Sequence, residues 1–403
     1  TGVPHHDVIT DYTKYGISND DPDIVKGRAG SPYAVKDYYN VNPDLAVDPA
    51  NRLEEFKALV DRTHKVGMKV VIDIVPNHVA RNYQSLTNPE GVEDFGASDD
   101  KTKTYDVNNN FYYNPGEEFR VPEFLNDYLP LGGEKHELSD KKFTEIPAKW
   151  TGNGSRLSQP HFNDWYETVK VNYGLSPEGR KDFDELPEGF DNEDYKVHFE
   201  FWKGKTVPDS WVKFRDIALY WLDFGVDGFR FDMAEMVPVE FWENTVTELK
   251  KIKPVFMLAE GWESNLMENA FDMGYGWDTH HRMNKIAQGE ENVKNWDARI
   301  AQIDSMYQED DILMNFVTNH DENSWSGTVK ERMGDASEVM LALSYCSPGM
   351  PLIYSGQEYD MSKRLRFFEK DTIIKTKGKV WPLMEKLGDL KTTNKALNGG
   401  KNA

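Results

Sequence analysis

The feature that most constrains the fold is a repeat in which an amphipathic helix ends at a glycine and a short apolar run follows. One helix begins after Asp48, whose side chain can cap it, and ends at Gly67. The run 70–75 (VVIDIV) then has the length and composition of a buried strand. A second copy places a helix over 210–224 and a strand over 226–231. Because these strands are apolar throughout, we expect a parallel α/β sheet covered by helices.

Four further apolar runs complete a set of six, and this number predicts a (β/α)8 TIM barrel rather than a small doubly wound sheet. The count is two strands short of eight, and residues 1–47 have the Gly, Pro, Asp and Tyr content of loops. We therefore expect the first two barrel strands to lie upstream of Thr1. The four additional strands are predicted near 255–259, 270–273, 312–317 and 350–354.

The stretch 79–209 interrupts the repeat. Loops longer than about 15 residues are uncommon unless they carry structure of their own, and this stretch is rich in Asn, Gly, Pro and aromatic residues. We expect it to be an inserted subdomain after the third barrel strand. The predicted organisation is a first barrel segment over 1–78, the insertion over 79–209, and a second barrel segment, with strands four to eight, over 210–403.

The charge balance excludes several classes of partner. With 47 Lys and Arg against 69 Asp and Glu, the net charge is −22, which repels nucleic acid and anionic membrane surfaces. No run approaches the roughly 18 apolar residues that a membrane-spanning helix needs, so membrane insertion is not expected. The single cysteine, Cys346, excludes an internal disulfide. The sequence does not indicate an oligomeric state.

Polar side chains recur where the predicted strands end. Asp73 lies inside its strand, and Arg230 and Asp232 lie at the end of theirs. Glu260 and Asp321 each follow a later strand. Because chemistry in a TIM barrel sits at the carboxyl ends of the strands, we expect three carboxylates from different strands to meet at one mouth.

Such an array suits glycoside cleavage, in which one carboxylate attacks the anomeric carbon and a second protonates the leaving oxygen. A lone Asp after a strand is usually a helix cap, but caps do not explain three matched positions. An Arg inside an apolar strand also requires a partner. Binding of divalent metals by the carboxylates, as in a phosphoester hydrolase, is the rival interpretation. His78 and His320 alone are equally consistent with site and structural roles.

At these residues the sequence resembles a known family. The segments VVIDIVPNH (70–78), GVDGFRFD (225–232), VFMLAEGWE (255–263) and FVTNHDENSW (316–325) are similar to the four ordered motifs of the α-amylase family, glycoside hydrolase family thirteen. SPYAVKDYYNVNPD (31–44) resembles the family's segment after its second barrel strand.

The resemblance implies three catalytic roles. Asp232 would be the nucleophile that forms a glycosyl-enzyme intermediate, and Glu260 would be the general acid/base. Asp321 would bind sugar hydroxyls and stabilise the distorted transition state. Hydrolysis would retain the α configuration, with a carboxyl separation of about 5–5.5 Å.

The same resemblance implies supporting roles. Arg230 would hold Asp232 ionised, with Asp73 as its buried partner. Trp262 and Trp325 are favoured among the aromatics as surfaces for stacking on glucose, because they follow the catalytic positions closely. The sugar at the cleavage point would contact His78, His320 and a stacking platform formed by Tyr33.

Calcium is the cofactor that the resemblance implies. Asn77 matches a ligand position of many family members, and Asp164 in FNDWYE (162–167) is a candidate second ligand. Asn77 could equally be a turn amide that bonds to the backbone.

The sequence departs from the family in two places. Glu235-Met236 stands where typical α-amylases carry Lys-His, and the family's C-terminal β-sandwich is not recognisable.

The sequence thus predicts a retaining hydrolase of α-1,4-glucosidic bonds in starch-like glucans. An α-glucosidase or neopullulanase-like enzyme acting on malto-oligosaccharides stays open, as does a catalytically inactive glucan-binding homologue. Because polymeric starch is met outside the cytoplasm, an extracellular or periplasmic location is expected.

Overall fold

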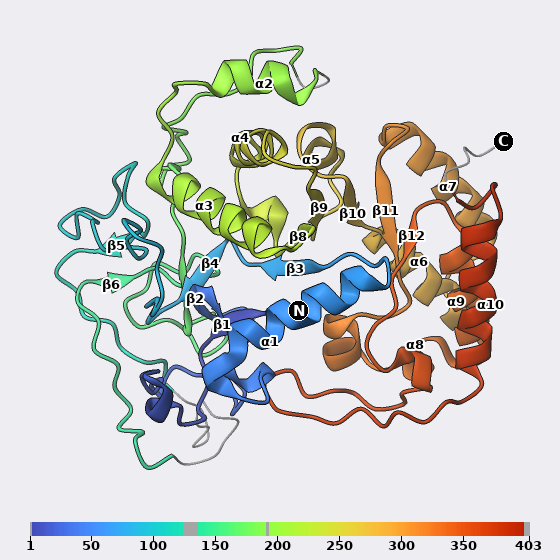
Figure 1. Cartoon of the computed structure of the whole chain (residues 1–403), viewed down its shortest axis with the longest axis horizontal. Coiled ribbons are helices and arrows are strands. Elements are labelled where there is room, and N and C mark those ends of the chain that lie inside the picture. Colours follow the sequence, from blue (N-terminus) through green and yellow to red (C-terminus); the bar gives the residue numbers. More distant parts are fainter. Residues whose placement is uncertain (1, 124–135, 191–192, 399–403) are drawn as a thin grey trace. The chain divides into compact units, whose positions relative to one another are not determined.

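The chain folds into two compact units, Thr1–Glu260 and Gly261–Ala403. A computed structural model describes residues 2–123, 136–190 and 193–398 (Figure 1). The predicted insertion, residues 79–209, lies within the first of these units. Among the described residues, no helix is both long and apolar enough to cross a membrane.

The first unit contains a parallel arrangement of three strands in the order β3, β8, β9. Asp73 is opposite Arg230, and Arg230 is opposite Leu258. Side chains that are opposite one another in paired strands project from the same face of the sheet. This register therefore fixes which polar residues can meet. The strands are β3 (Val71–Ile74), β8 (Gly228–Phe231) and β9 (Phe256–Ala259).

Helices α1 (Arg52–Lys65), α3 (Asp209–Phe224) and α4 (Val239–Lys250) alternate with these strands, as predicted. The indole of Trp221 on α3 donates to the Tyr38 carbonyl at 2.8 Å and packs edge-on against Phe56 of α1. Phe56 and Val60 form the buried face of α1, while Leu59 between them is 45% exposed.

The expectation that residues 1–47 form only loops is wrong. β1 (Pro4–His6) and β2 (Val35–Val41) pair in an antiparallel sheet. Every residue of β2 is buried, including Lys36, whose ammonium pairs with Asp20 at 2.5 Å. Polar residues satisfied by such buried partners made the segment resemble a loop.

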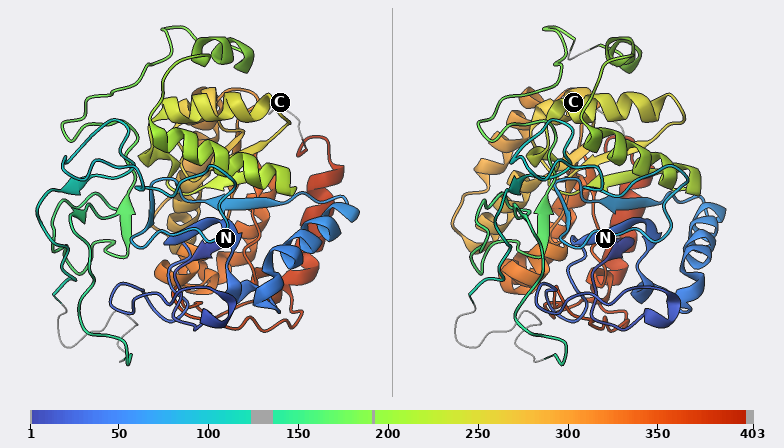
Figure 2. Two further views of the ribbon diagram at one scale, coloured as in Figure 1. Left: turned by 60° about the vertical axis from the view of Figure 1, so that its left-hand side comes forward. Right: turned by 90° about the vertical axis from the view of Figure 1, so that its left-hand side faces the viewer.

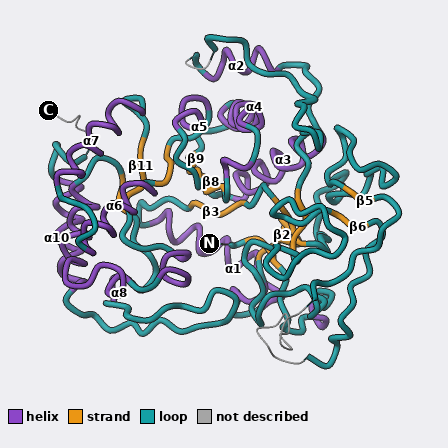
Figure 3. The backbone as a smooth tube through the Cα atoms, turned by 180° about the vertical axis from the view of Figure 1, so that it is seen from behind, coloured by secondary structure: helices purple, strands orange, loops and turns teal. Residues whose placement is uncertain are grey.

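The insertion consists mainly of loops around short antiparallel pairs (Figures 2 and 3). β4 (His78–Ala80) pairs with β7 (Thr168–Lys170), and β5 (Tyr113–Asn114) pairs with β6 (Ala148–Lys149). Helix α2 (Tyr195–Trp202) follows and packs near α4. His78 therefore begins a strand that joins the third barrel strand to the insertion.

The second unit contains the remaining parallel strands, in the order β10, β11, β12. All six predicted parallel strands are thus present, with β10 three residues later than expected. The elements are β10 (Met273–Tyr275), β11 (Ile312–Asn315) and β12 (Met350–Pro351), with helices α5 (Ser264–Asn269), α6 (Trp277–Gln288), α7 (Lys294–Met306), α8 (Val329–Met333), α9 (Ser337–Cys346) and α10 (Val380–Thr393).

Candidate active site

One guanidinium group gathers three carboxylates in the first unit. Nη1 of Arg230 lies 2.9 Å and 3.0 Å from the two Asp73 oxygens and 2.8 Å from Oδ1 of Asp232. Nη2 of Arg230 lies 2.9 Å from Oε2 of Glu260. The buried Asp73–Arg230 pair that the sequence predicted is therefore confirmed.

The strand register explains why these groups meet. Asp73 and Arg230 are direct partners in β3 and β8, and Asp232 lies two positions after Arg230 on the same side. The main-chain N–H of Asp232 continues the ladder by donating to the Ile74 carbonyl at 2.9 Å. The cluster is thus built from strand ends and not from mobile loops.

Glu260 is held by the turn that follows Asp232. The N–H of Met233 donates to Oε2 of Glu260 at 2.9 Å, and the N–H of Ala234 donates to the Glu260 carbonyl at 3.1 Å. Met233 has a φ of 47°, in the left-handed region that non-glycine residues rarely adopt. This strained turn aims its amide at the carboxylate.

The electrostatics of the cluster act on the carboxyl of Asp232. Burial raises the pKa of Asp232 well above its usual value, Glu260 and Asp73 raise it further, and Arg230 opposes them. Three carboxylates against one guanidinium carry excess negative charge. The carboxyl of Asp232 therefore takes up a proton more readily than an exposed aspartate does.

Tyr33 and His78 lie beside this cluster. The ring of Tyr33 is centred 5.8 Å from the guanidinium carbon of Arg230. His78 is buried, hydrogen-bonds to the Tyr33 backbone, and packs 5.3 Å from the ring of Trp165. Burial, followed by the charge of Lys170, lowers the pKa of His78 to about 3, so its imidazole is neutral at ordinary pH.

The second unit holds the remaining predicted catalytic residue. Asp321 precedes the turn 322–326 and lies 3.2 Å from Nε2 of His320. Oδ1 of Asn319 caps that turn by accepting from the N–H of Glu322 at 2.8 Å. His320 and Asp321, which are neighbours in the sequence, thus contact each other. The expected meeting of Asp321 with Asp232 and Glu260 stays a prediction.

A half-buried phenylalanine links this histidine to an exposed tryptophan. Trp325 is 59% exposed, and the centre of its ring lies 5.3 Å from that of Phe367 in a tilted contact. The ring of Phe367 is centred 6.2 Å from that of His320. Phe367 was missed, and the adjacent Phe-Phe pair in an otherwise polar segment was the one signal for it. Trp262 is 41% exposed, and its carbonyl accepts from the Tyr307 hydroxyl at 2.5 Å.

The two expected calcium ligands have other partners. Oδ1 of Asn77 accepts from the ammonium of Lys170, and its Nδ2 donates to the Gly152 carbonyl at 3.0 Å. Asp164 accepts from Nδ2 of Asn153 at 2.7 Å and from the His161 N–H at 2.8 Å. Within the described part of the chain, no group of three or more His, Cys, Asp or Glu side chains could hold a metal ion.

Lys170 is the residue at this position that sequence reasoning missed. Burial lowers the pKa of its amine to about 8, which leaves the amine largely protonated at neutral pH. Lys170 lies between Val169 and Val171. This alternation is also typical of a strand lysine that faces solvent, so the sequence offers no sign of the burial that lowers the pKa of Lys170.

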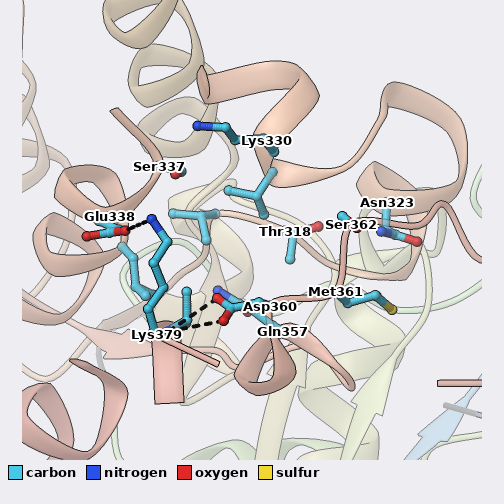
Figure 4. A pocket seen from close by; sticks show the side chains of 14 residues that line it. Thr318, Asn323, Lys330, Ser337, Glu338, Gln357, Asp360, Met361, Ser362 and Lys379 are labelled. Atoms are coloured by element: carbon cyan, nitrogen blue, oxygen red, sulfur yellow. Dashed lines mark hydrogen bonds and ion pairs between the residues drawn. The ribbon is translucent and has the colours of Figure 1, made fainter. Parts of the chain in front are cut away.

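A separate cavity of about 450 Å³ lies in the second unit (Figure 4). Its lining is aliphatic around Val317, Leu341 and Val380, and the Glu338–Lys379 ion pair of 2.5 Å lies at its wall. None of the predicted site residues lines it.

The parallel strands, the alternating helices and the carboxylates at the strand ends are the arrangement of a (β/α)8-barrel catalytic domain. The family model described as "Alpha amylase, catalytic domain" matches residues 21–123 and 201–387. The chain belongs to the α-amylase family, whose members include hydrolases and transferases, and the resemblance seen in the sequence motifs is confirmed.

Individual relatives are distant. The chain is 23% identical over 399 residues to a cyclomaltodextrin glucanotransferase of Geobacillus stearothermophilus, covering 91% of this chain and 43% of the relative. It is 27% identical over 257 residues to a 4-alpha-glucanotransferase of Thermotoga maritima, covering 56% and 54%. The chain thus spans about half the length of these curated relatives.

A crystal structure of an α-amylase from Lactobacillus plantarum is similar to this fold. The TM-score is 0.60 at 23% identity, with coverage of 98% of this chain and 72% of that one. At this identity the likeness supports the barrel fold alone.

Proposed function

We propose that this chain is a retaining glycoside hydrolase that cleaves α-1,4-glucosidic bonds in starch-like glucans through a glycosyl-enzyme intermediate. The observation that carries the proposal is the contact of the Arg230 guanidinium with both Asp232 and Glu260. It holds two carboxylates from neighbouring strands against one positive group, as a nucleophile and an acid acting on one bond require.

In this mechanism Asp232 attacks the anomeric carbon while Glu260 donates its proton to the leaving oxygen. Glu260 then removes a proton from water, and the resulting hydroxide nucleophile displaces Asp232 with net retention. Arg230 stabilises the carboxylate of Asp232 whenever the glycosyl ester is absent. Asp321 is proposed to bind hydroxyls of the distorted sugar, and His78 and Tyr33 to contact the same ring.

The test is incubation with soluble starch, reading the anomer first released and the product sizes. We expect α-anomeric products from the wild type, and a loss of kcat of at least about 10³-fold in Asp232→Asn and Glu260→Gln, since each removes a reacting group. Maltodextrin binding should persist in both variants. Near-normal turnover in either variant, or β-anomeric product, would contradict the proposal.

Matched controls separate loss of chemistry from loss of charge. Asp223→Asn changes an exposed carboxylate on α3, and Glu263→Gln changes an exposed carboxylate three positions after Glu260. Both controls should retain wild-type activity.

A preference for malto-oligosaccharides is the second candidate, and it rests on residues 235–236. A glutamate and a methionine that is 48% exposed stand where typical family members carry Lys-His. A higher kcat/KM on maltotriose than on starch would favour this candidate, and the reverse would favour an endo-acting amylase. If polymeric starch is the substrate, the location of the enzyme is expected to be extracellular or periplasmic, because the polymer is met outside the cytoplasm.

A further inference from the structure

The junction between the third barrel strand and the insertion contains a cation that belongs to the chain itself. Lys170 is the last residue of β7 and is directly opposite His78 in the β4–β7 pair. Its ammonium donates to Oδ1 of Asn77 and lies 3.5 Å from the Met236 carbonyl. One amine thus bridges the end of β3, the insertion and the turn that follows Asp232.

The oxygen atoms around Lys170 fit an ammonium better than a calcium ion. They are an amide oxygen and a main-chain carbonyl, both neutral, and no carboxylate in the described part of the chain pairs with Lys170. A calcium site requires six to eight oxygens, usually with carboxylates among them. Asp164, the expected acidic ligand, bonds instead to Asn153 and the His161 N–H.

We propose that the Lys170 ammonium takes the place of a calcium ion at Asn77, so that the folded chain is stabilised at this junction without metal. The two contacts of its ammonium connect the end of β3 and the turn after Asp232 to the insertion. The inference rests on family membership and on the contacts of Lys170, and does not depend on the substrate or on the catalytic assignments.

The test measures metal binding and thermal unfolding of the full chain. The chelator-treated wild type is titrated with calcium in a calorimeter, and its unfolding midpoint is recorded with excess calcium and with chelator. We expect no stoichiometric binding and a midpoint that changes by less than about 1 °C, since a ligand that does not bind the native state cannot stabilise it. Binding of one calcium per chain, with a lower midpoint in chelator, would overturn the proposal.

A variant tests the role of the amine. Lys170→Met keeps the length of the side chain but removes its charge and donors, so its midpoint should fall by several degrees in chelator and in calcium alike. The control Lys103→Met removes an exposed lysine that pairs with Asp100 and Asp106, and should leave the midpoint nearly unchanged. A Lys170→Met variant as stable as the control would overturn the bridging role. If Lys170→Met does not fold, the wild-type calcium titration decides the question.

Discussion

Arg230 is the residue on which the candidate site depends. A planar guanidinium presents several donors in fixed directions, and here its two terminal nitrogens contact Asp73, Asp232 and Glu260. A lysine carries the same charge on a single nitrogen and cannot reproduce these directions.

Arg230→Lys should therefore lower kcat by about 10²-fold or more, because Asp232 and Glu260 lose the guanidinium donors that hold both carboxylates in position. The measurement is steady-state kinetics on maltodextrin, with the unfolding midpoint recorded in parallel. Arg180→Lys, at an exposed pair with Asp182, is the control and should behave as the wild type. Full activity in Arg230→Lys would show that the guanidinium geometry is dispensable.

His5 makes the stability of the N-terminal sheet depend on pH. Its side chain is fully buried, and burial lowers its pKa well below the usual 6.5. The unfolded chain then takes up a proton that the native chain excludes, so stability present above pH 6.5 is lost as the pH falls.

His5→Phe removes this proton uptake. Between pH 7 and pH 5 the free energy of unfolding of the wild type should fall more than that of the variant, because only the wild type takes up this proton on unfolding. Denaturant unfolding at both pH values measures the difference. Parallel pH dependence of the two proteins would exclude His5 as the source.

Among the secondary-structure elements, β8 and β9 lie so close together at Gly228 that a side chain there would displace one strand from the other. A Cβ added at Gly228 would lie 2.2 Å from the Phe256 carbonyl oxygen, a backbone atom that cannot move aside. Asp232 and Glu260 directly follow these two strands. Displacing one strand from the other would therefore displace one carboxylate from the other.

Gly228→Ala should lower both stability and kcat, by several degrees in the midpoint and by about 10-fold or more in rate. Gly388→Ala is the matched control, since nothing lies within 4 Å of its added Cβ in α10. Alanine there should stabilise by up to about 1 kcal/mol through helix propensity. Wild-type kinetics in Gly228→Ala would show that β8 and β9 tolerate separation.

The contacts of Asp73 and Lys170 differ in whether they could be predicted from the sequence. The sequence alone predicted that Arg230, inside an apolar strand, requires a buried partner, and the resemblance to the family identified that partner as Asp73. The Lys170–Asn77 contact was not, since it depends on the path of a long insertion that no local pattern encodes. β1 and β2 were missed for a related reason, because their polar residues are satisfied by distant partners such as Asp20.

For the whole molecule, the net charge of −22 should make stability depend on salt. Self-repulsion acts over about 30 Å at 0.01 M salt and about 8 Å at 0.15 M. The unfolding midpoint should therefore rise as sodium chloride is added over this range, while an uncharged cosolute at equal osmolality should not reproduce the rise. A falling midpoint would mean that individual ion pairs outweigh the overall repulsion.

The central claim is that Asp232 forms a covalent bond to the sugar, and trapping that bond tests it most directly. The wild type is treated with an activated fluorinated α-glucosyl fluoride, whose ring fluorine slows hydrolysis of the intermediate, and the labelled peptide is sequenced by mass spectrometry. We predict one glycosyl group per chain, attached to Asp232 and absent from Asp232→Asn. A label on any other residue, or an active wild type that releases product without ever carrying a label, would contradict the account.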